Sequence, residues 1–326
     1  MNVTVGRTAN HAVLVLSLVT HVHCGVPEAD DQGSLGSGRE VAVTFDDVPG
    51  VHLPARGCHY TELAQLNQTL LEVLARHRVP ATGLVVESNL CNGDDASLGD
   101  LLTMWLDAGM ELGNHSFSHP DLNTVSPDVY NADILRGAAS TQRVLQERGK
   151  TLKYFRHPYL HTGRDRRTKA AVDAFLAEHG YQVAPVTIDN QEWVFAAVYA
   201  RALSRQDHVT MQRVGDAYLV YMEEMFAFFE DLSVEVLGYE VRQVLLLHAN
   251  PLNAAYIDAL VRMMKRRGYH FVSLDRALED PAYQLADSYA GPRGLSWLHR
   301  WAFSKGMPIT EEPREPSWIR QLFETP

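Results

Sequence analysis

The chain has 326 residues, of which 46% are apolar and 21% are charged, and its formal net charge is −11. This length and apolar content suffice for a substantial core in one large domain or two small ones. The negative charge argues against a general affinity for nucleic acid or for anionic membranes, because a surface of that sign repels phosphate. We therefore expect a globular protein that does not bind nucleic acid.

The N-terminus has the pattern of a secretory leader. Arg7 precedes an apolar run at residues 12–20, and a polar stretch at 28–38 follows. The run is shorter than the roughly 20 apolar residues that a transmembrane helix needs. We predict a leader over residues 1–27 and an exported protein, periplasmic or extracellular, that is not an integral membrane protein and has no lipid anchor at Cys24.

Two cysteines, Cys58 and Cys91, follow the predicted leader. An even number suits one disulfide in an oxidising compartment. Two free thiols fit the sequence equally well, and the spacing leaves both readings open.

From Glu40 onward, short β-rich segments alternate with segments of helical period, in the order typical of repeated β-α units. The first units are a strand at 41–45, a helix at 61–77, a strand at 82–87 and a helix at 101–108. The later units are a helix from 126, strands at 154–155 and 182–188, a helix at 168–179, a strand at 244–247, a helix at 254–267 and a strand at 270–274. Six or seven such units predict an α/β fold, a distorted (β/α)7-type barrel.

Two regions depart from this alternation. Residues 194–241 form a helical insertion before the last strands, with apolar and aromatic side chains at three- and four-residue spacing that predict packing and not a ligand site. These side chains are Tyr218, Tyr221, Met222, Met225, Phe226 and Phe229. Residues 281–326 are polar but contain Trp297, Trp301 and Trp318, so we expect a C-terminal tail that packs on the barrel. Glycan stacking by one of these tryptophans is the alternative.

Two short motifs carry residues suited to metal chemistry. Asp46 and Asp47 directly follow the first predicted strand, at the end of a β-α unit where polar side chains collect. His115 and His119 are four residues apart, a spacing that brings both imidazoles to one face of a helical turn. An Asp-Asp pair alone is usually a solvated turn, but two histidines and one carboxylate form a zinc site with open coordination positions.

These motifs resemble the first two of five in the polysaccharide deacetylases, carbohydrate esterase family 4, which contain the NodB homology domain. They are Thr44-Phe45-Asp46-Asp47 and His115-Ser116-Phe117-Ser118-His119. The other three follow in family order as Arg156-His157-Pro158-Tyr159, Asp189-Asn190-Gln191-Glu192-Trp193 and Leu245-Leu246-Leu247-His248. The resemblance implies a catalytic domain over about residues 38–280.

The resemblance also implies roles for individual residues. Asp47, His115 and His119 would bind Zn²⁺ or another divalent transition metal, and Asp46 would act as the base on the metal-bound water. His248 would protonate the leaving group, and Arg156 would orient Asp46 and keep it ionised. The backbone N–H of Tyr159 would stabilise the oxyanion, and Trp193 would line the acetyl pocket.

Two motifs depart from the family pattern. The fourth has Glu192 where the family has aspartate, so either Glu192 or Asp189 would tune the histidine of the fifth motif. In the third motif, residues 160–163 follow the tyrosine where many relatives have glycine, which reshapes the rim of the site. We interpret His157 and His161 as solvated loop histidines, with substrate contact as the alternative.

The sequence therefore predicts a hydrolase that removes N- or O-linked acetyl groups from a glycan, with an acetylated glycan as its partner. A metal-dependent hydrolase of a small amide or imide on the same barrel is the first alternative, which a closed pocket would favour. A non-catalytic glycan-binding barrel is the second, although a binding protein has no need of a general base. A serine hydrolase lacks support, because the sequence has no Gly-x-Ser-x-Gly motif.

Overall fold

Parallel strands form the centre of the fold, in a computed structural model that describes residues 1–2, 4, 38–53, 59–90 and 95–325. Within these residues one sheet has seven strands in the order β5-β4-β3-β2-β1-β6, and β7 pairs with the first residues of β1. The strands are β1 (Arg39–Val48), β2 (Ala81–Val85), β3 (Glu111–Asn114), β4 (Tyr154–Phe155), β5 (Gln182–Val183), β6 (Gln243–His248) and β7 (Tyr269–Phe271). Nearly all of the predicted leader, together with Cys24, Cys58 and Cys91, lies outside the described residues.

The sheet curls toward a barrel. The chain continues from β5 to the far edge of the sheet, where Ile188 forms an isolated parallel bridge with Leu245 of β6. The backbone N–H of Leu246 donates to the Ile188 carbonyl at 3.2 Å. This contact joins the β5 side of the sheet to its β6 side, and the prediction of a distorted parallel-stranded barrel is confirmed.

Strand β1 shows how the barrel presents side chains to the site. Val43 and Phe45 pack in the large core between the sheet and the helices. Ala42 packs on the opposite face of the sheet, against a different group of buried residues. Side chains alternate along a strand, so Thr44 and Asp46 share the face of Ala42. Asp46 is therefore the last side chain on the inner face of the barrel, at the carboxyl end of its central strand.

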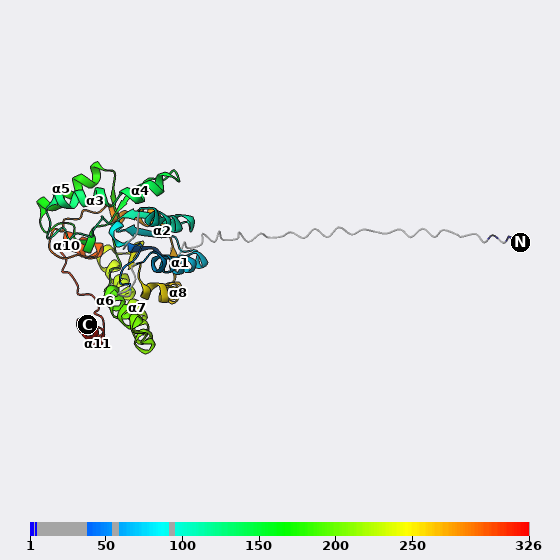
Figure 1. Cartoon of the computed structure of the whole chain (residues 1–326). Helices are drawn as coiled ribbons and strands as arrows, with labels where there is room; N and C mark the ends of the chain where they lie inside the picture. Colours follow the sequence, from blue (N-terminus) through cyan, green and yellow to red (C-terminus); the bar gives the residue numbers. More distant parts are fainter. Residues whose placement is uncertain (3, 5–37, 54–58, 91–94, 326) are drawn as a thin grey trace, which may run out of the picture. The chain divides into compact units, whose positions relative to one another are not determined.

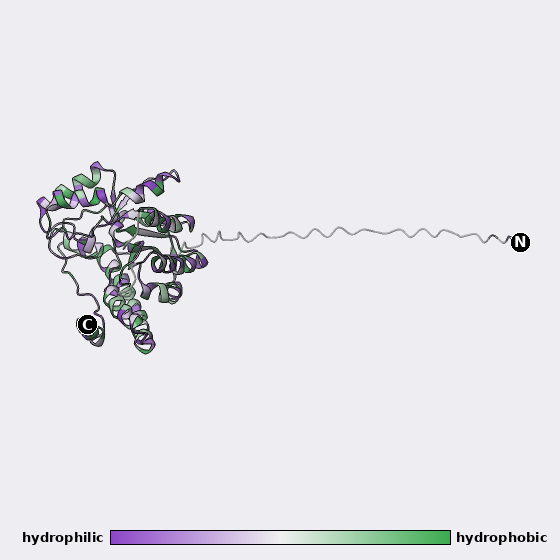
Figure 2. Cartoon of the chain, in the orientation of Figure 1, coloured by the Kyte–Doolittle hydropathy of each residue, from purple (hydrophilic) through white to green (hydrophobic). Residues whose placement is uncertain are grey.

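Helices surround the sheet (Figure 1). Their mixed hydrophilic and hydrophobic residues, visible along α5 and α7, are typical of helices with one buried face (Figure 2). The long helices of the first half are α1 (Tyr60–His77), α2 (Asp95–Asp107), α3 (Pro127–Arg136), α4 (Ala139–Gln146) and α5 (Arg166–Glu178). Those of the second half are α6 (Glu192–Ser204), α7 (His208–Leu237), α8 (Pro251–Arg266), α9 (Leu274–Leu278), α10 (Trp297–Ser304) and α11 (Ser317–Glu324). Short 3-10 helices are η1 (Glu87–Asn89), η2 (Pro158–Leu160) and η3 (Pro281–Gln284).

The elements follow the predicted order, with local differences. The helix expected from residue 126 is two helices, α3 and α4, separated at Gly137. A Cβ at Gly137 would lie 2.3 Å from the backbone carbon of Ser116, so only glycine lets this turn approach the loop that carries His115 and His119. The last predicted strand ends at Phe271, because Ser273 caps α9 by accepting a hydrogen bond from Arg276 N–H.

The insertion and the C-terminal tail are packed parts of the fold. The aromatic and methionine side chains of α7 named above are fully buried, as the packing interpretation predicts. Helix α10 packs against α7, and α11 packs against α6. Trp301 is buried, and Trp297 and Trp318 pack partly buried against the core. Among the described residues, no helix has the length and apolar character needed to cross a membrane.

Candidate active site

A pocket of about 510 Å³ lies at the carboxyl ends of the central strands. Asp46 and Asp47 enter it from the end of β1, His115 directly follows β3, and His248 ends β6. In parallel sheets and barrels this end of the strands is where binding and catalytic residues collect. The remaining lining residues are Val51, His52, His119, Tyr159, Leu160, Asp189, Asn190, Gln191, Trp193, Leu246 and Gly294.

Three of the predicted metal ligands lie close together. One ligand atom each of Asp47, His115 and His119 lies within 4.8 Å of the other two, and His119 Nε2 is 3.7 Å from Asp47 Oδ1. His115 Nδ1 donates a hydrogen bond of 2.8 Å to the Arg156 carbonyl, which leaves its Nε2 lone pair free for a ligand. Burial lowers the pKa of His119 to about 4, so this imidazole is neutral at physiological pH. One carboxylate and two imidazoles are a donor set that zinc accepts, and the residues present therefore fit such a metal.

The backbone around this cluster is unusual. Asp47, Ser116 and His119 have φ angles of 62°, 72° and 55°, in the left-handed region that non-glycine residues rarely adopt. Asp133 stabilises the bent loop, because its Oδ1 accepts the N–H groups of both Phe117 and Ser118 at 2.9 Å. The expected helical turn between the two histidines is thus wrong: a bent loop brings their rings together, with centroids 4.9 Å apart. Such backbone outliers cluster at functional sites, where the surrounding packing holds them in place.

Asp46 forms a buried ion pair. Its side chain is 2% exposed, and its Oδ1 accepts a hydrogen bond of 2.6 Å from Nη1 of the fully buried Arg156. Arg156 also donates to Thr44 Oγ1 at 2.7 Å and to the Ala184 carbonyl at 3.2 Å, which fixes the guanidinium inside the barrel. Burial is the largest influence and opposes ionisation of Asp46, but the charge and hydrogen bond of Arg156, together with the charges of His115 and His248, hold the pKa of this carboxyl below its usual value. Asp46 is therefore a carboxylate at neutral pH, with its Oδ2 3.6 Å from His115 Nε2.

His248 has a buried acidic partner. Its Nδ1 donates a hydrogen bond of 2.7 Å to Oε2 of Glu192, a residue with no exposed surface. The other carboxylate oxygen of Glu192 accepts from the side-chain amides of Asn250 and of Asn253, the latter at 2.8 Å. Burial alone would lower the pKa of His248, but the charge of Glu192 and this hydrogen bond raise it to about 9. His248 is therefore protonated at neutral pH.

Asp189 lies in the same pocket in a different environment. Its Oδ1 accepts a hydrogen bond of 2.8 Å from the backbone N–H of Asn190. Burial, and then the charge of Glu312, raise the pKa of Asp189 to about 8, so this carboxyl is largely neutral at pH 7. Of the two acids that the sequence offered as the partner of His248, Glu192 makes the hydrogen bond.

Two further predicted residues line the pocket. Tyr159 is 56% exposed, and its ring lies edge-on to His119 with the centroids 4.5 Å apart. Its φ of 58° places it among the left-handed residues of the site. Trp193, the second residue of α6, packs edge-on against Phe323 of α11 with the centroids 5.3 Å apart. Tyr159, of the third motif, and Trp193, of the fourth, thus both lie at the rim of the pocket.

The two extra histidines of the third motif do not line the pocket. His157 is 1% exposed and lies 3.0 Å from the Tyr130 hydroxyl through its Nδ1, and burial lowers its pKa well below the usual value. The interpretation of His157 as a solvated loop histidine is wrong, because it packs beside the Phe155 ring at a centroid distance of 5.1 Å. His161 pairs with Asp121 at 2.7 Å.

Other lining residues had no distinguishing signal in the sequence. His52 lies in the loop that follows β1, and burial lowers its pKa. Its place shortly after the Asp46-Asp47 motif is the one feature that could have suggested it. Gly294 comes from the C-terminal tail, more than 40 residues after the last motif, and a Cβ there would lie 1.9 Å from the Tyr159 carbonyl oxygen. No pattern in the tail predicts that contact.

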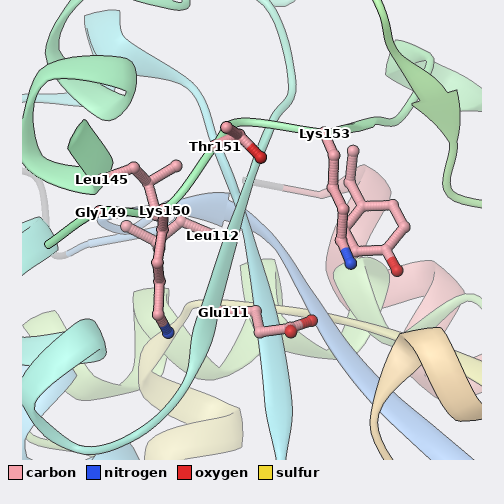
Figure 3. A pocket seen from close by; sticks show the side chains of 8 residues that line it. Glu111, Leu112, Leu145, Gly149, Lys150, Thr151 and Lys153 are labelled. Carbon is pink, nitrogen blue, oxygen red and sulfur yellow. The ribbon is translucent and has the colours of Figure 1, made fainter.

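Another cavity, of about 270 Å³, lies at the opposite end of β3 (Figure 3). Glu111, the first residue of β3, lines it together with Lys150 and Lys153, and Lys153 also forms an ion pair with Asp275. Burial raises the pKa of Glu111. Because His115 follows the last residue of the same strand, this cavity is separate from the predicted site.

Comparison with known proteins supports the resemblance, and the family model covers the first three of the five motifs. The model of the polysaccharide deacetylase family matches residues 35–184. Chitin deacetylase of Colletotrichum lindemuthianum is 24% identical over 240 residues, which cover 74% of this chain and 79% of that protein. Its crystal structure shares the fold, with a TM-score of 0.51 at 21% identity over 74% of this chain and 88% of that one. Residues 35–184 are therefore similar to the polysaccharide deacetylases, and the wider match to chitin deacetylase extends over 240 residues of the chain.

Two bacterial relatives match over less of their length. Chitooligosaccharide deacetylase of a Bradyrhizobium strain is 25% identical over 161 residues, 49% of this chain and 62% of that protein. Peptidoglycan-N-acetylglucosamine deacetylase of Listeria monocytogenes is 23% identical over 241 residues, 73% of this chain and 39% of that protein. The chain thus spans less than two thirds of each bacterial relative.

Proposed function

We propose that this protein is a metal-dependent hydrolase that removes acetyl groups from a glycan. One observation carries the proposal: an ionised carboxylate, Asp46, and a protonated imidazole, His248, line the same pocket as a set of three metal-binding side chains. A base and an acid held in opposite protonation states at one pH are what acyl-group hydrolysis requires.

Asp47, His115 and His119 would hold the metal, zinc or another divalent transition metal. When bound, such an ion lowers the pKa of a coordinated water and polarises a carbonyl oxygen. Because His115 Nδ1 is committed to the Arg156 carbonyl, the ring keeps the orientation and tautomer in which Nε2 is the ligand atom.

Asp46 would act as the general base. Arg156 occupies its Oδ1, so Oδ2 is the oxygen left to accept a proton from the attacking water. Asp47 cannot share this role while its carboxylate is a metal ligand. The two adjacent aspartates would therefore have different roles because Asp46 pairs with Arg156, whereas Asp47 would bind the metal.

His248 would act as the general acid. Glu192 holds the proton on Nδ1, which leaves the Nε2–H to protonate the departing amine or alkoxide. Glu192 thereby plays a positioning role like that of the carboxylate partner in other acid-base pairs.

The rim would hold the acetyl group. We assign the developing oxyanion to the backbone N–H of Tyr159, on the left-handed turn beside His119, and the acetyl methyl to the indole of Trp193. Asp189, neutral at pH 7, would donate a hydrogen bond to substrate and would not tune His248.

The substrate we propose is a polymer of N-acetylated sugars, since the relatives are named for chitin, chitooligosaccharides and peptidoglycan N-acetylglucosamine. O-linked acetyl groups on a glycan are the second chemistry within the proposal. Residues 38–280 would form the catalytic domain, exported behind the leader at 1–27, with 281–326 packed on it. Export is supported by the apolar run near the N-terminus.

Acetate release tests the proposal. The purified protein is incubated with chitooligosaccharides, peptidoglycan and acetylated xylan, with chelator, with zinc restored, and beside an Asp46→Ala variant. We expect acetate release that needs both metal and Asp46. If no acetate is released although each chain binds one zinc, the glycan assignment is overturned. Turnover of cyclic imides or small amides by the same protein would then establish the small-substrate alternative. A chain that binds glycans without binding metal would be a non-catalytic barrel.

A further inference from the structure

A third cavity, of about 680 Å³, lies beside the active-site pocket. All of its lining residues except Gln191 belong to the C-terminal tail, residues 281–326. We call it the tail cavity and define it by Gln191, Arg293, Glu312, Arg314 and Ser317. The tail therefore does more than cover the barrel, because it forms most of the lining of a hollow beside the active-site pocket.

The tail cavity and the active-site pocket adjoin each other. Gln191 lines both of them. The consecutive residues Arg293 and Gly294 line one cavity each, Arg293 the tail cavity and Gly294 the active-site pocket. The two cavities therefore lie on either side of Gln191 and of the Arg293–Gly294 backbone.

Tertiary contacts hold the dividing rim in place. Asn123 Nδ2 donates to the Pro292 carbonyl at 3.0 Å, and Gly291 N–H donates to the Gly163 carbonyl at 3.1 Å. The close approach of Gly294 to the Tyr159 carbonyl adds a third attachment between the tail and the third motif. These contacts join the rim to the loop after the second motif and to the segment that follows the third motif.

The wall of the tail cavity that α11 forms is attached to the active site through α6. Ile319 of α11 has no exposed surface, and Arg201 of α6 donates to the Phe323 carbonyl at 3.3 Å. Phe323 in turn packs against Trp193, which lines the active-site pocket. Helix α11 therefore supports a wall of each cavity.

The lining of the tail cavity suits a ligand rich in hydroxyl groups. It carries the ion pairs Glu311–Arg314, at 3.2 Å, and Glu315–Arg320, so much of its charge is balanced. A guanidinium only donates hydrogen bonds and a carboxylate only accepts them, whereas a sugar hydroxyl does both. Balanced charge gives little preference for a phosphate or a polycation, and closely spaced donors and acceptors favour a neutral polyhydroxyl ligand.

We propose that the tail cavity binds a further sugar unit of the same glycan chain whose acetylated unit occupies the active-site pocket. The inference rests on the proposed function and deepens it, because it assigns the C-terminal tail to substrate binding. Arg293 and Glu312 are the residues we assign to the hydroxyl groups of that unit. The protein should accordingly prefer oligomers to monosaccharides.

The test compares kcat/KM for tetra-N-acetylchitotetraose with kcat/KM for N-acetylglucosamine in Arg293→Ala and Glu312→Gln. We expect the tetramer-to-monomer ratio to fall about tenfold in each, the effect of one lost charge-assisted hydrogen bond. Arg166→Ala and Glu178→Gln, at exposed positions on α5, are the matched controls and should leave the ratio unchanged.

Two outcomes separate this inference from the proposed function. An unchanged ratio in well-folded Arg293→Ala and Glu312→Gln proteins that still release acetate would overturn the tail cavity as a sugar site and leave the proposed function intact. If no acetate is released from any glycan, calorimetric titration with the tetramer decides the inference by itself. A roughly tenfold weaker Kd in Arg293→Ala supports it, and equal affinity or no binding to the wild type overturns it.

Discussion

The two sides of the active-site pocket are built in different ways. On the metal side, Asp46 and Asp47 lie at the end of β1, and His115 follows β3. Strand β2 lies between these two strands in the sheet. On the acid side, His248 ends β6, but its partner Glu192 begins α6 and is 56 residues away in the chain. The metal side depends on strand ends and on the loop that Asp133 holds after β3, whereas the acid side depends on how the insertion packs.

The two sides also use opposite electrostatics. Arg156, fully buried, keeps Asp46 negative, and Glu192, fully buried, keeps His248 positive. Each side therefore consists of one titrating group that faces the pocket and one buried counter-ion behind it. A base and an acid can therefore coexist at one pH because each has its own buried partner. Removal of Arg156 should mainly change the pKa of Asp46, and removal of Glu192 should mainly change that of His248.

Loss of the base should have the largest effect. Asp46→Asn keeps the size and polarity of the side chain but cannot accept the proton, so kcat should fall about 10³-fold, within the range for loss of a general base. Zinc content, measured by atomic absorption, should stay at the wild-type value because Asp47, His115 and His119 remain. Loss of zinc together with activity would contradict the separate roles of the two aspartates.

Loss of Arg156, the counter-ion on the metal side, should have the second-largest effect on activity. Arg156→Leu leaves Asp46 buried without a partner, and we expect about 3–5 kcal/mol lower free energy of unfolding by denaturant titration. Burial then raises the pKa of Asp46, so the acid limb of the kcat/KM profile should move to higher pH, and activity at pH 6 should fall about 10²-fold.

Arg156→Lys is the matched control for that change. It retains the charge and should recover part of the stability and most of the pH profile. An acid limb at the wild-type position in Arg156→Leu would mean that Arg156 does not set the ionisation of Asp46.

Loss of the counter-ion on the acid side should be milder. The pKa of His248 is about 9, so the acid form is present below pH 9 and activity should decline as the pH rises through that value. Glu192→Gln removes the charge that raises this pKa, so the alkaline limb should move to lower pH, with about tenfold lower activity at pH 8. Asp189→Asn should move the limb far less, and the reverse order of the two variants would reassign the partner to Asp189.

The smallest effect should come from the C-terminal helix. Phe323→Ala removes the edge-on contact with Trp193, worth about 0.5–1.5 kcal/mol, and should raise KM about threefold with kcat little changed. Leu322→Ala, at the neighbouring exposed position, is the control. Equal KM values in the two variants would show that α11 does not position Trp193.

Much of the site could be predicted from the sequence because its residues are local to strand ends. A buried strand followed by Asp46-Asp47, two histidines four residues apart and a histidine directly after the strand at 244–247 are visible as short patterns. Parallel strands bring their carboxyl ends to one edge, so the predicted strands were enough to bring Asp46, Asp47 and His248 together. The position of His115 depends on β3, which was not among the predicted strands. The (β/α)7-type fold followed from the same alternation.

The tertiary structure decided what depends on contacts between distant segments. Glu192, and not Asp189, reaches His248 because Asn250 and Asn253 hold its carboxylate at the start of α6. Asp133 fixes the loop between His115 and His119, which spacing alone suggested to be helical.

By itself, then, the sequence determined the alternation of strands and helices along the chain, most of the residues at the strand ends and the resemblance to the polysaccharide deacetylases. Only the tertiary structure decided the partner of His248, the burial of His157 and the entry of Gly294 into the pocket. The physical reason is that local periodicity dictates which face of an element is buried, whereas side-chain pairing is set by the packing of elements far apart in the chain.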